Sequence, residues 1–540
     1  MWVRRWDGLM TLTSERTDIH DTATAVTVGV APLTPADVVA VAREGREVRV
    51  DAGALDRVRR SRRVVEALAD DPEPHYGIST GFGALATTHI PDDRRVALQR
   101  SLIRSHAAGS GPEVEREVVR GLMLLRIATL ATGRTGVRVE TLEAYVALLN
   151  AQVTPVVHEH GSLGCSGDLA PLAHCALALM GEGEVRDAHG RRRPAAEVLA
   201  EAGLTPVVLR EKEGLALTNG TDGMLAMLVL AVVDLRALLK VADVSAAMSV
   251  EGLLGSDAVF ADDLQRLRPH PGQAASAANL RALMAGSEVR DSHRRRELDE
   301  APCTRVQDAY SLRCAPQVAG AVRDTVDHAA RVGEAELASA IDNPVITLDD
   351  RVESNGNFHG APVAYVLDFA AIAAADLASI AERRTDRFLD QTRSAGLPPF
   401  LAHDPGVDSG LMIAQYTQAA LVSELKRLAV PASVDSIPSS AMQEDHVSMG
   451  WSAGRKLRRA VDALTQVLAI EVMTAARGLE LRAPLRPSPA GAAAIGVLRE
   501  AGVPGPGPDR WLAPEIETAV RVVADGRLLA AVEAVTGPLA

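Results

Sequence analysis

Four long stretches of the chain are apolar with few interruptions. Residues 221–255 are apolar on nearly every face, and residues 361–380 contain only two charged side chains, Asp368 and Asp376. Residues 411–430 have the same character and end before a proline, and residues 452–482 carry leucines and valines at steps of three and four. Because the first two lack a polar face, they are expected to lie inside a large core or an oligomer. The pattern predicts four long helices.

Shorter signals indicate further helices and almost no sheet. Thr34 and Pro35 are typical of a helix start, with Thr34 as the N-cap and Pro35 in the first turn. Residues 484–508 predict turns around a short helix, and residues 514–531 predict one more helix. Alternating apolar and polar runs are scarce and short, so the expected fold class is all-α, with long helices side by side. The expected organisation is a weakly ordered extension (1–26), an N-terminal region (27–220), a central long-helix bundle (221–482) and a C-terminal helical segment (483–540).

Composition and charge narrow the choice of partners and compartment. Hydrophobic residues make up 47% of the chain and aromatic residues only 3%, which favours closely packed helices over sheets. The formal net charge is -13, so neither nucleic acid nor an anionic membrane is an expected partner. Four cysteines without C-x-x-C spacing are typical of a cytoplasmic protein, and residues 1–26 contain no signal sequence.

Residues 161–174, with the sequence GSLGCSGDLAPLAH, carry the strongest chemical signal. Their three glycines within seven residues require a tight, irregular backbone. The spacing G-x-x-G-x-x-G differs from that of a dinucleotide loop, and no Lys-Ser or Lys-Thr pair follows as in a P-loop. A serine hydrolase elbow needs G-x-S-x-G, and Ser166 stands one residue out of step with it.

Self-cyclisation explains the residue types better. The amide nitrogen of Gly167 can attack the carbonyl carbon of Cys165, because Gly167 has no Cβ to obstruct the approach. Two waters are lost, and Ser166 gives up its hydroxyl to become an exocyclic methylidene. Cys165 contributes only its backbone, so its side chain is loosely specified.

This segment resembles the signature of the histidine, phenylalanine and tyrosine ammonia-lyase and aminomutase family. That family carries a 4-methylidene-imidazol-5-one (MIO) group, and its commonest triplet begins with Ala where this chain has Cys165. Four more blocks resemble the family in its order, and the similarity runs from about residue 26 to the C-terminus. They are residues 76–83 (YGISTGFG), 212–221 (KEGLALTNGT), 307–313 (QDAYSLR) and 356–359 (GNFH).

The resemblance implies a helical homotetramer whose active sites combine residues from more than one subunit. It implies that Tyr76, on a glycine-rich mobile loop, takes the β-proton, and that Asn219 binds the MIO carbonyl or the substrate. Phe358 is implied to pack against the ring. Gln307, Tyr310 and Arg313 are spaced by three and are expected to share one helix face. The Arg313 guanidinium suits a carboxylate, and Tyr310 can hydrogen-bond near the amine or the ring.

Two positions bear on the substrate. Within the resemblance, Ser105-His106 and Glu444 match the histidine-type enzymes, whereas the phenylalanine and tyrosine types differ at both places. A histidine and a carboxylate can both hydrogen-bond an imidazole. Glu444 is also a candidate second acid or base, and the choice between it and Tyr76 as the base stays open. The spacing of residues 158–160 (HEH) is not that of a zinc motif, so no metal is expected.

The function implied is removal of ammonia from L-histidine to give trans-urocanate, the first step of histidine breakdown, with no external cofactor. Two alternatives stay open. One is a tyrosine or phenylalanine lyase or aminomutase with the same chemistry, against which Glu444 argues. The other is a helical scaffold protein whose triplet never cyclises.

Overall fold

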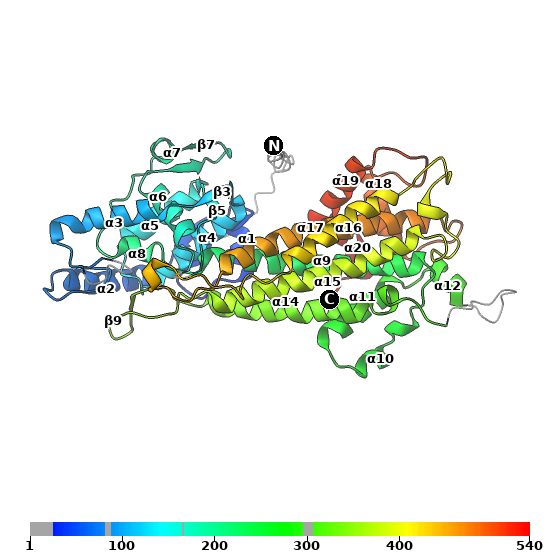
Figure 1. The fold of residues 1–540 in the computed structure, drawn as a ribbon, viewed down its shortest axis with the longest axis horizontal. Coiled ribbons are helices and arrows are strands. Elements are labelled where there is room, and N and C mark those ends of the chain that lie inside the picture. Colours follow the sequence, from blue (N-terminus) through cyan, green and yellow to red (C-terminus); the bar gives the residue numbers. More distant parts are fainter. Residues whose placement is uncertain (1–24, 82–87, 165–166, 295–305) are drawn as a thin grey trace.

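Five long helices, which alternate in direction along the chain, form the centre of the molecule (Figure 1). The computed structural model describes residues 25–81, 88–164, 167–294 and 306–540. The five helices are α9 (Asp222–Gly252), α14 (Ala315–Leu337), α15 (Ala361–Leu389), α16 (Met412–Leu428) and α17 (Gly450–Glu480). Helix α15 packs against α14, α16 and α17, and α9 packs against α14 and α17. The all-α prediction and all four predicted long helices are confirmed.

Helix α15 continues nine residues beyond the predicted end at 380. The apolar pattern stops there because the last turns contain charged side chains. Two of these, Glu382 and Arg384, are nevertheless buried. Arg384 donates to the Glu471 carboxylate of α17 at 2.9 Å, and both side chains are almost fully buried. A buried ion pair therefore continues the helix packing where the apolar pattern ends.

Short helices and strands form the N-terminal region, which lies at the end of the bundle where α9 begins (Figure 1). Thr34 caps α1 and makes the capping box with Asp37, as its sequence predicts. The strands have two to four residues and form small separate sheets: β1 with β2, β3 with β5, β4 with β6 and β7, and β8 with β9. The bounds are β1 Val26–Val28, α1 Pro35–Ala42, β2 Val48–Val50, α2 Ala52–Ala69, α3 Asp92–His106, β3 Ser110–Glu113, α4 Arg116–Ala131, α5 Val139–Asn150, β4 Thr154–Pro155, β5 His158–His160, α6 Leu169–Leu179, β6 Glu184–Arg186, β7 Arg192–Pro194, α7 Ala195–Glu201, α8 Glu213–Ala216, β8 Val345–Ile346 and β9 Val352–Glu353.

The remaining helices lie toward the opposite end of the bundle (Figure 1). Helix α18 is the short helix predicted within residues 484–508. The single helix predicted over residues 514–531 is wrong, because the chain turns at Asp525 and Gly526 and starts a new helix. The bounds are α10 Asp262–Arg266, α11 Pro271–Leu283, α12 Glu288–Arg294, α13 Tyr310–Arg313, α18 Pro489–Glu500, α19 Ala513–Ala524 and α20 Arg527–Thr536.

One helix, α15, is long and apolar enough to cross a membrane by length and composition alone. Most of its apolar face is buried between neighbouring helices, and Asp368 on it is paired with Lys456 of α17 at 2.6 Å. The helix packing therefore accounts for most of its apolar composition, while Tyr365, Phe369 and Ile372 stay exposed.

Candidate active site

The predicted electrophile lies between strand β5 and helix α6. Cys165 and Ser166 lie outside the described residues, but Gly167 is described and pairs with Gly220 in a parallel bridge. Gly167 has φ of +77°, and a Cβ there would overlap the Gly220 carbonyl oxygen. That oxygen also accepts a hydrogen bond from the Asp168 amide at 2.7 Å. Only glycine fits at position 167, as the cyclisation chemistry requires.

The residues just before the triplet are held by the segment that leads into α17. The Met449 amide donates to the Leu163 carbonyl at 2.9 Å, and the Ser448 hydroxyl donates to the Gly164 carbonyl at 3.2 Å. Gly164 has no space for a side chain, because Ser448 occupies it. Both ends of the triplet are thus tied to the bundle by backbone contacts.

Three long helices begin around this point. Helices α9, α15 and α17 start at Asp222, Ala361 and Gly450, and the Met224 thioether fills the space beside Gly360 and Gly450. The amino ends of helices carry partial positive charge and unsatisfied N–H groups. Their convergence makes the neighbourhood of the triplet favourable for electron-rich atoms.

Asp168 is fully buried at the start of α9. Its carboxylate accepts from the Met224 amide at 2.8 Å and from the Ser162 hydroxyl at 3.0 Å. Burial raises the pKa of Asp168 to about 7, although these hydrogen bonds oppose the shift. Sequence reasoning placed no role on Asp168, because an acidic residue at a helix start is usually just a cap.

Asn219 lies beside Gly220 and is held by a second segment. Its side-chain amide donates to the Asn343 carbonyl at 3.0 Å. Asp342, next in the chain, is paired with Lys212 at 2.6 Å, and both of these side chains are completely buried. This pair fixes the backbone that orients Asn219, and neither member was singled out from the sequence.

His106 and Glu444 are brought together from distant parts of the chain. His106 ends α3, and the next residues are fixed by a hydrogen bond from the Gly109 amide to His174 Nε2 at 3.1 Å, on α6. Burial lowers the pKa of His106, and the nearby Glu444 carboxylate opposes that shift. The Ser439 hydroxyl donates to Glu444 at 2.8 Å. The structure thus places a histidine and a carboxylate within electrostatic reach of each other.

Two further predicted residues, Tyr76 and Phe358, lie in loops. Tyr76 is half-buried in a turn in which the His75 amide donates to the Ser79 hydroxyl at 2.9 Å, and most of the remaining loop, residues 82–87, is outside the described residues. Phe358 is half-buried beside His359, whose ring stacks on that of His446 with centroids 5.6 Å apart. His446 follows Glu444 closely, so these rings border the site.

The block containing Gln307, Tyr310 and Arg313 lies elsewhere. The Ser256 amide, just beyond the end of α9, donates to Asp308 at 2.7 Å. Helix α9 has 31 residues, so this contact is roughly 45 Å along the helix from its start beside Gly167. Within one chain, the structure does not bring these residues to the triplet.

The expectation that all three share one helix face is wrong for Gln307. Helix α13 covers only four residues, and Gln307 lies in a bend before it, because Ala309 has an extended backbone and Asp308 turns back to α9. Tyr310 and Arg313 do meet, with the guanidinium carbon 4.6 Å from the ring centroid. Tyr310 is 71% exposed, so this surface is open in the single chain.

Comparisons with known proteins show the family to which this chain belongs. The family described as aromatic amino acid lyase matches residues 33–500. A histidine ammonia-lyase from Streptomyces avermitilis is 65% identical over 515 residues, which cover 95% of this chain and 99% of that protein. The chain therefore belongs to the aromatic amino acid lyase family.

Solved structures agree with this membership. A tyrosine aminomutase from Streptomyces globisporus has a TM-score of 0.90 and 38% identity, covering 96% of this chain and 100% of that one. A histidine ammonia-lyase from Trypanosoma cruzi has a TM-score of 0.87 and 37% identity, covering 95% and 96%. The resemblance drawn from the sequence motifs is confirmed at the level of family and fold.

Proposed function

We propose that this chain is a histidine ammonia-lyase, which converts L-histidine to trans-urocanate and ammonium. The electrostatic interaction between His106 and Glu444 carries the proposal, because the segments that follow them, at Gly109 and Met449, contact Gly161 and Leu163 just before the triplet. Relatives 64–65% identical over nearly their whole length bear the name histidine ammonia-lyase, which supports it. In the overall reaction the C–N electron pair leaves with the nitrogen, the β C–H pair forms the C=C bond, and the released proton completes ammonium.

Residues 165–167 are proposed to form the MIO group. Its exocyclic methylidene would supply the electrophile that turns the substrate amine into a leaving group. Two observations support formation of this group at residues 165–167. Gly167 has no room for a side chain, and the Ser448 hydroxyl holds the Gly164 carbonyl just before the triplet. Asn219 and the converging helix starts are proposed to stabilise the electron-rich oxygen of the group.

The imidazole of the substrate is proposed to lie between His106 and Glu444. A desolvated imidazole needs a partner at each nitrogen, and a site that supplies both discriminates strongly against a phenyl ring. His106 is suited to remain neutral because burial lowers its pKa, so it can donate or accept a single hydrogen bond. Phe358 is proposed to pack against the ring.

Removal of the β-proton is assigned to Tyr76. Its turn borders the loop at residues 82–87, and Gly77 in it has a positive φ that favours glycine. A loop that carries the base can close over the bound substrate and exclude water. Glu444 is the second candidate for this proton.

The remaining site residues are proposed to come from another subunit. Arg313 and Tyr310, with Gln307 beside them, are proposed to bind the carboxylate and amine of a substrate held in a neighbouring copy. Their separation from the triplet by the length of α9 supports this arrangement. The proposed assembly is a homotetramer.

An exposed apolar stripe supports self-association. It follows the first half of α15 at helical spacing, where Tyr365, Phe369 and Ile372 are exposed. Ile413 and Tyr416 of α16 are exposed near the other end of α15, where the Gln415 side chain donates to Glu382 at 2.5 Å. A second copy packed here would cover the stripe; a cytoplasmic location for the assembly stays a prediction.

The test is a parallel assay of the purified chain with L-histidine, L-tyrosine and L-phenylalanine. The conjugated product is followed by its ultraviolet absorbance. Urocanate from histidine alone is the expected result. Turnover of tyrosine or phenylalanine in place of histidine would overturn the assignment of His106 and Glu444 while leaving the family membership intact.

A further inference from the structure

A carboxylate without a basic partner lies close to the proposed electrophile. Glu336, near the end of α14, accepts a hydrogen bond from the Thr221 hydroxyl at 2.5 Å. Thr221 follows Gly220, which contacts Gly167. Among the described residues, no lysine, arginine or histidine forms an ion pair with Glu336, and the neighbouring Asp222 is also a carboxylate. Glu336 is half-buried, and a cation bound beside it would favour its charged form.

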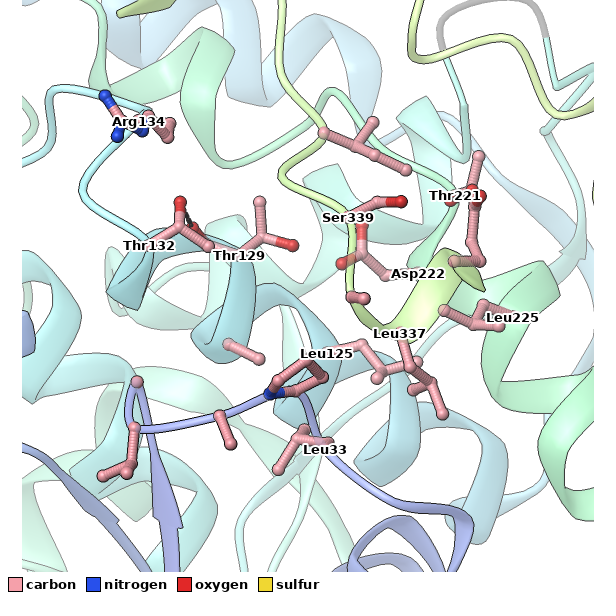
Figure 2. Close-up of a pocket in the computed structure, with 18 of the residues that line it drawn as sticks. Leu33, Leu125, Thr129, Thr132, Arg134, Thr221, Asp222, Leu225, Leu337 and Ser339 are labelled. Carbon is pink, nitrogen blue, oxygen red and sulfur yellow. Dashed lines mark hydrogen bonds between the residues drawn. The ribbon is translucent and has the colours of Figure 1, made fainter. Parts of the chain in front are cut away.

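A cavity of about 290 Å³ opens on one side of Glu336. Figure 2 shows the hydroxyl-bearing side chains of Thr129, Thr132, Thr221 and Ser339 along one part of its wall, with leucines opposite. Hydroxyl oxygens can accept hydrogen bonds from a small cation without neutralising the carboxylate. The wall continues to residues 29–33, and Arg57 and Arg134 also line the cavity, so the negative end of the cavity is the part formed by Glu336 and Asp222.

A second cavity lies on the other side of the same residue. It shares Glu336, Ser339 and Ile341 with the first, and its far wall is formed by Asn357 and His359. His359 Nε2 is buried and has no hydrogen-bond partner. Because Nδ1 accepts the Ala361 amide at 3.4 Å, the neutral His359 ring carries its proton on Nε2, which is a donor toward the cavity and not a ligand for a cation.

We propose that Glu336 and the two cavities that meet at it bind the ammonium product and form its path away from the site. The proposal rests on the proposed function, which makes ammonium in the adjoining region. Ammonium has four N–H donors and one charge. Glu336 offers the opposing charge, while Thr221 and Ser339 offer hydroxyl oxygens that can accept from ammonium.

Charge and burial agree with this assignment. Burial raises the pKa of Glu336, and the charge of Asp222 raises it further, while the Thr221 hydrogen bond opposes both. Asp222 does not compete for the cation, because it is already paired with Arg126. A bound cation would relieve the desolvation of Glu336, so the carboxylate gains more from ammonium than an exposed one would.

The experiment measures inhibition of histidine turnover by added ammonium chloride, with sodium chloride at equal ionic strength as the salt control. Glu336→Gln keeps an oxygen for Thr221 but removes the charge. It should weaken inhibition by ammonium about tenfold, the usual loss for a charge-assisted contact. The KM for L-histidine should stay within about twofold of the original value.

Glu334→Gln is the matched control, because Glu334 is exposed on the same helix and lines neither cavity. It should behave as the unaltered chain. Glu336→Asp keeps the charge and should recover most of the ammonium inhibition, which a purely structural role would not predict. Unchanged ammonium inhibition in a folded Glu336→Gln chain would overturn this proposal alone; absence of urocanate from the unaltered chain would overturn both proposals.

Discussion

At the scale of single residues, the account depends on side chains that the fold places near one another from distant segments. His106 ends α3, Glu444 precedes α17, and their electrostatic interaction appears only in the folded chain. Neither residue is distinctive by itself, since a histidine at a helix end or a glutamate in a loop is commonplace. The family resemblance singled them out, and the fold brings them together.

Glu444→Gln is expected to lower kcat for L-histidine at least about 100-fold, the usual range for loss of an acid or base. Thermal stability should change little, because glutamine can still accept the Ser439 hydrogen bond. Asp445→Asn, an exposed neighbour, is the control and should leave kcat unchanged. Steady-state kinetics and a melting curve for each variant check this. Equal rates for the two variants would remove Glu444 from the site.

Asp168 gives a pH-dependent prediction. Its pKa is raised to about 7 in the folded chain, so the folded state holds a proton that the unfolded state releases near pH 4. Its contribution to stability is therefore fully present at low pH and is lost as the pH rises from about 4 to about 7. The melting temperature of Asp168→Asn, relative to the unaltered chain, should rise across this window. A constant difference would mean that Asp168 does not titrate there.

At the scale of elements, the triplet depends on a backbone that few residues can adopt. Gly167→Ala would place a methyl group on the Gly220 carbonyl and strain a positive φ, so the segment could not keep its contact with Gly220. We expect turnover to fall below detection.

Gly190→Ala is the matched control for this substitution. Gly190 has a similar φ of +78°, but no atom lies within 4 Å of its would-be Cβ. It should lose only about 1 kcal/mol of stability and keep its activity. Parallel assays and melting curves of the two variants test whether close packing, rather than φ alone, selects glycine at 167. Full activity in Gly167→Ala would contradict the account.

The sequence predicts the elements well where the apolar pattern is long. The bounds of α9, α16 and α17 differ from the predicted ones by three residues or fewer, because a continuous apolar face requires burial along its whole length. The end of α15 was missed because charged residues usually indicate a surface position. In the folded chain Arg384 and Glu471 form a buried ion pair, which the sequence alone does not reveal. The break at Gly526 was missed because the apolar spacing continues through it.

At the scale of the whole molecule, the predicted site residues form two groups at opposite ends of α9. The triplet and Asn219 lie at the start of α9, and Tyr310 and Arg313 lie beyond its end. Sequence spacing could not reveal this separation, because it depends on how the long helices turn back on one another. Without the family resemblance, the spacing in residues 307–313 would equally indicate a helix-surface salt bridge and a core tyrosine.

Complementation tests the proposed sharing of sites. Chains with Ser166→Ala and chains with Arg313→Ala should each be nearly inactive alone. Co-expressed, they should recover part of the activity, because some sites in a mixed oligomer combine an intact triplet from one copy with an intact Arg313 from another. Ser166→Ala mixed with Gly167→Ala should recover no activity, because both changes affect the triplet and no copy in the mixture supplies an intact one. Equal results from the two mixtures would contradict a shared site.

The most direct measurement is the intact mass of the purified chain, compared with that of Ser166→Ala. The account predicts that the unaltered chain is lighter than its sequence by two waters, with the loss confined to the peptide containing residues 165–167. Ser166→Ala cannot form the methylidene and should not lose both waters. The full, unmodified mass in a folded and otherwise intact chain would contradict the electrophile on which the proposed reaction depends.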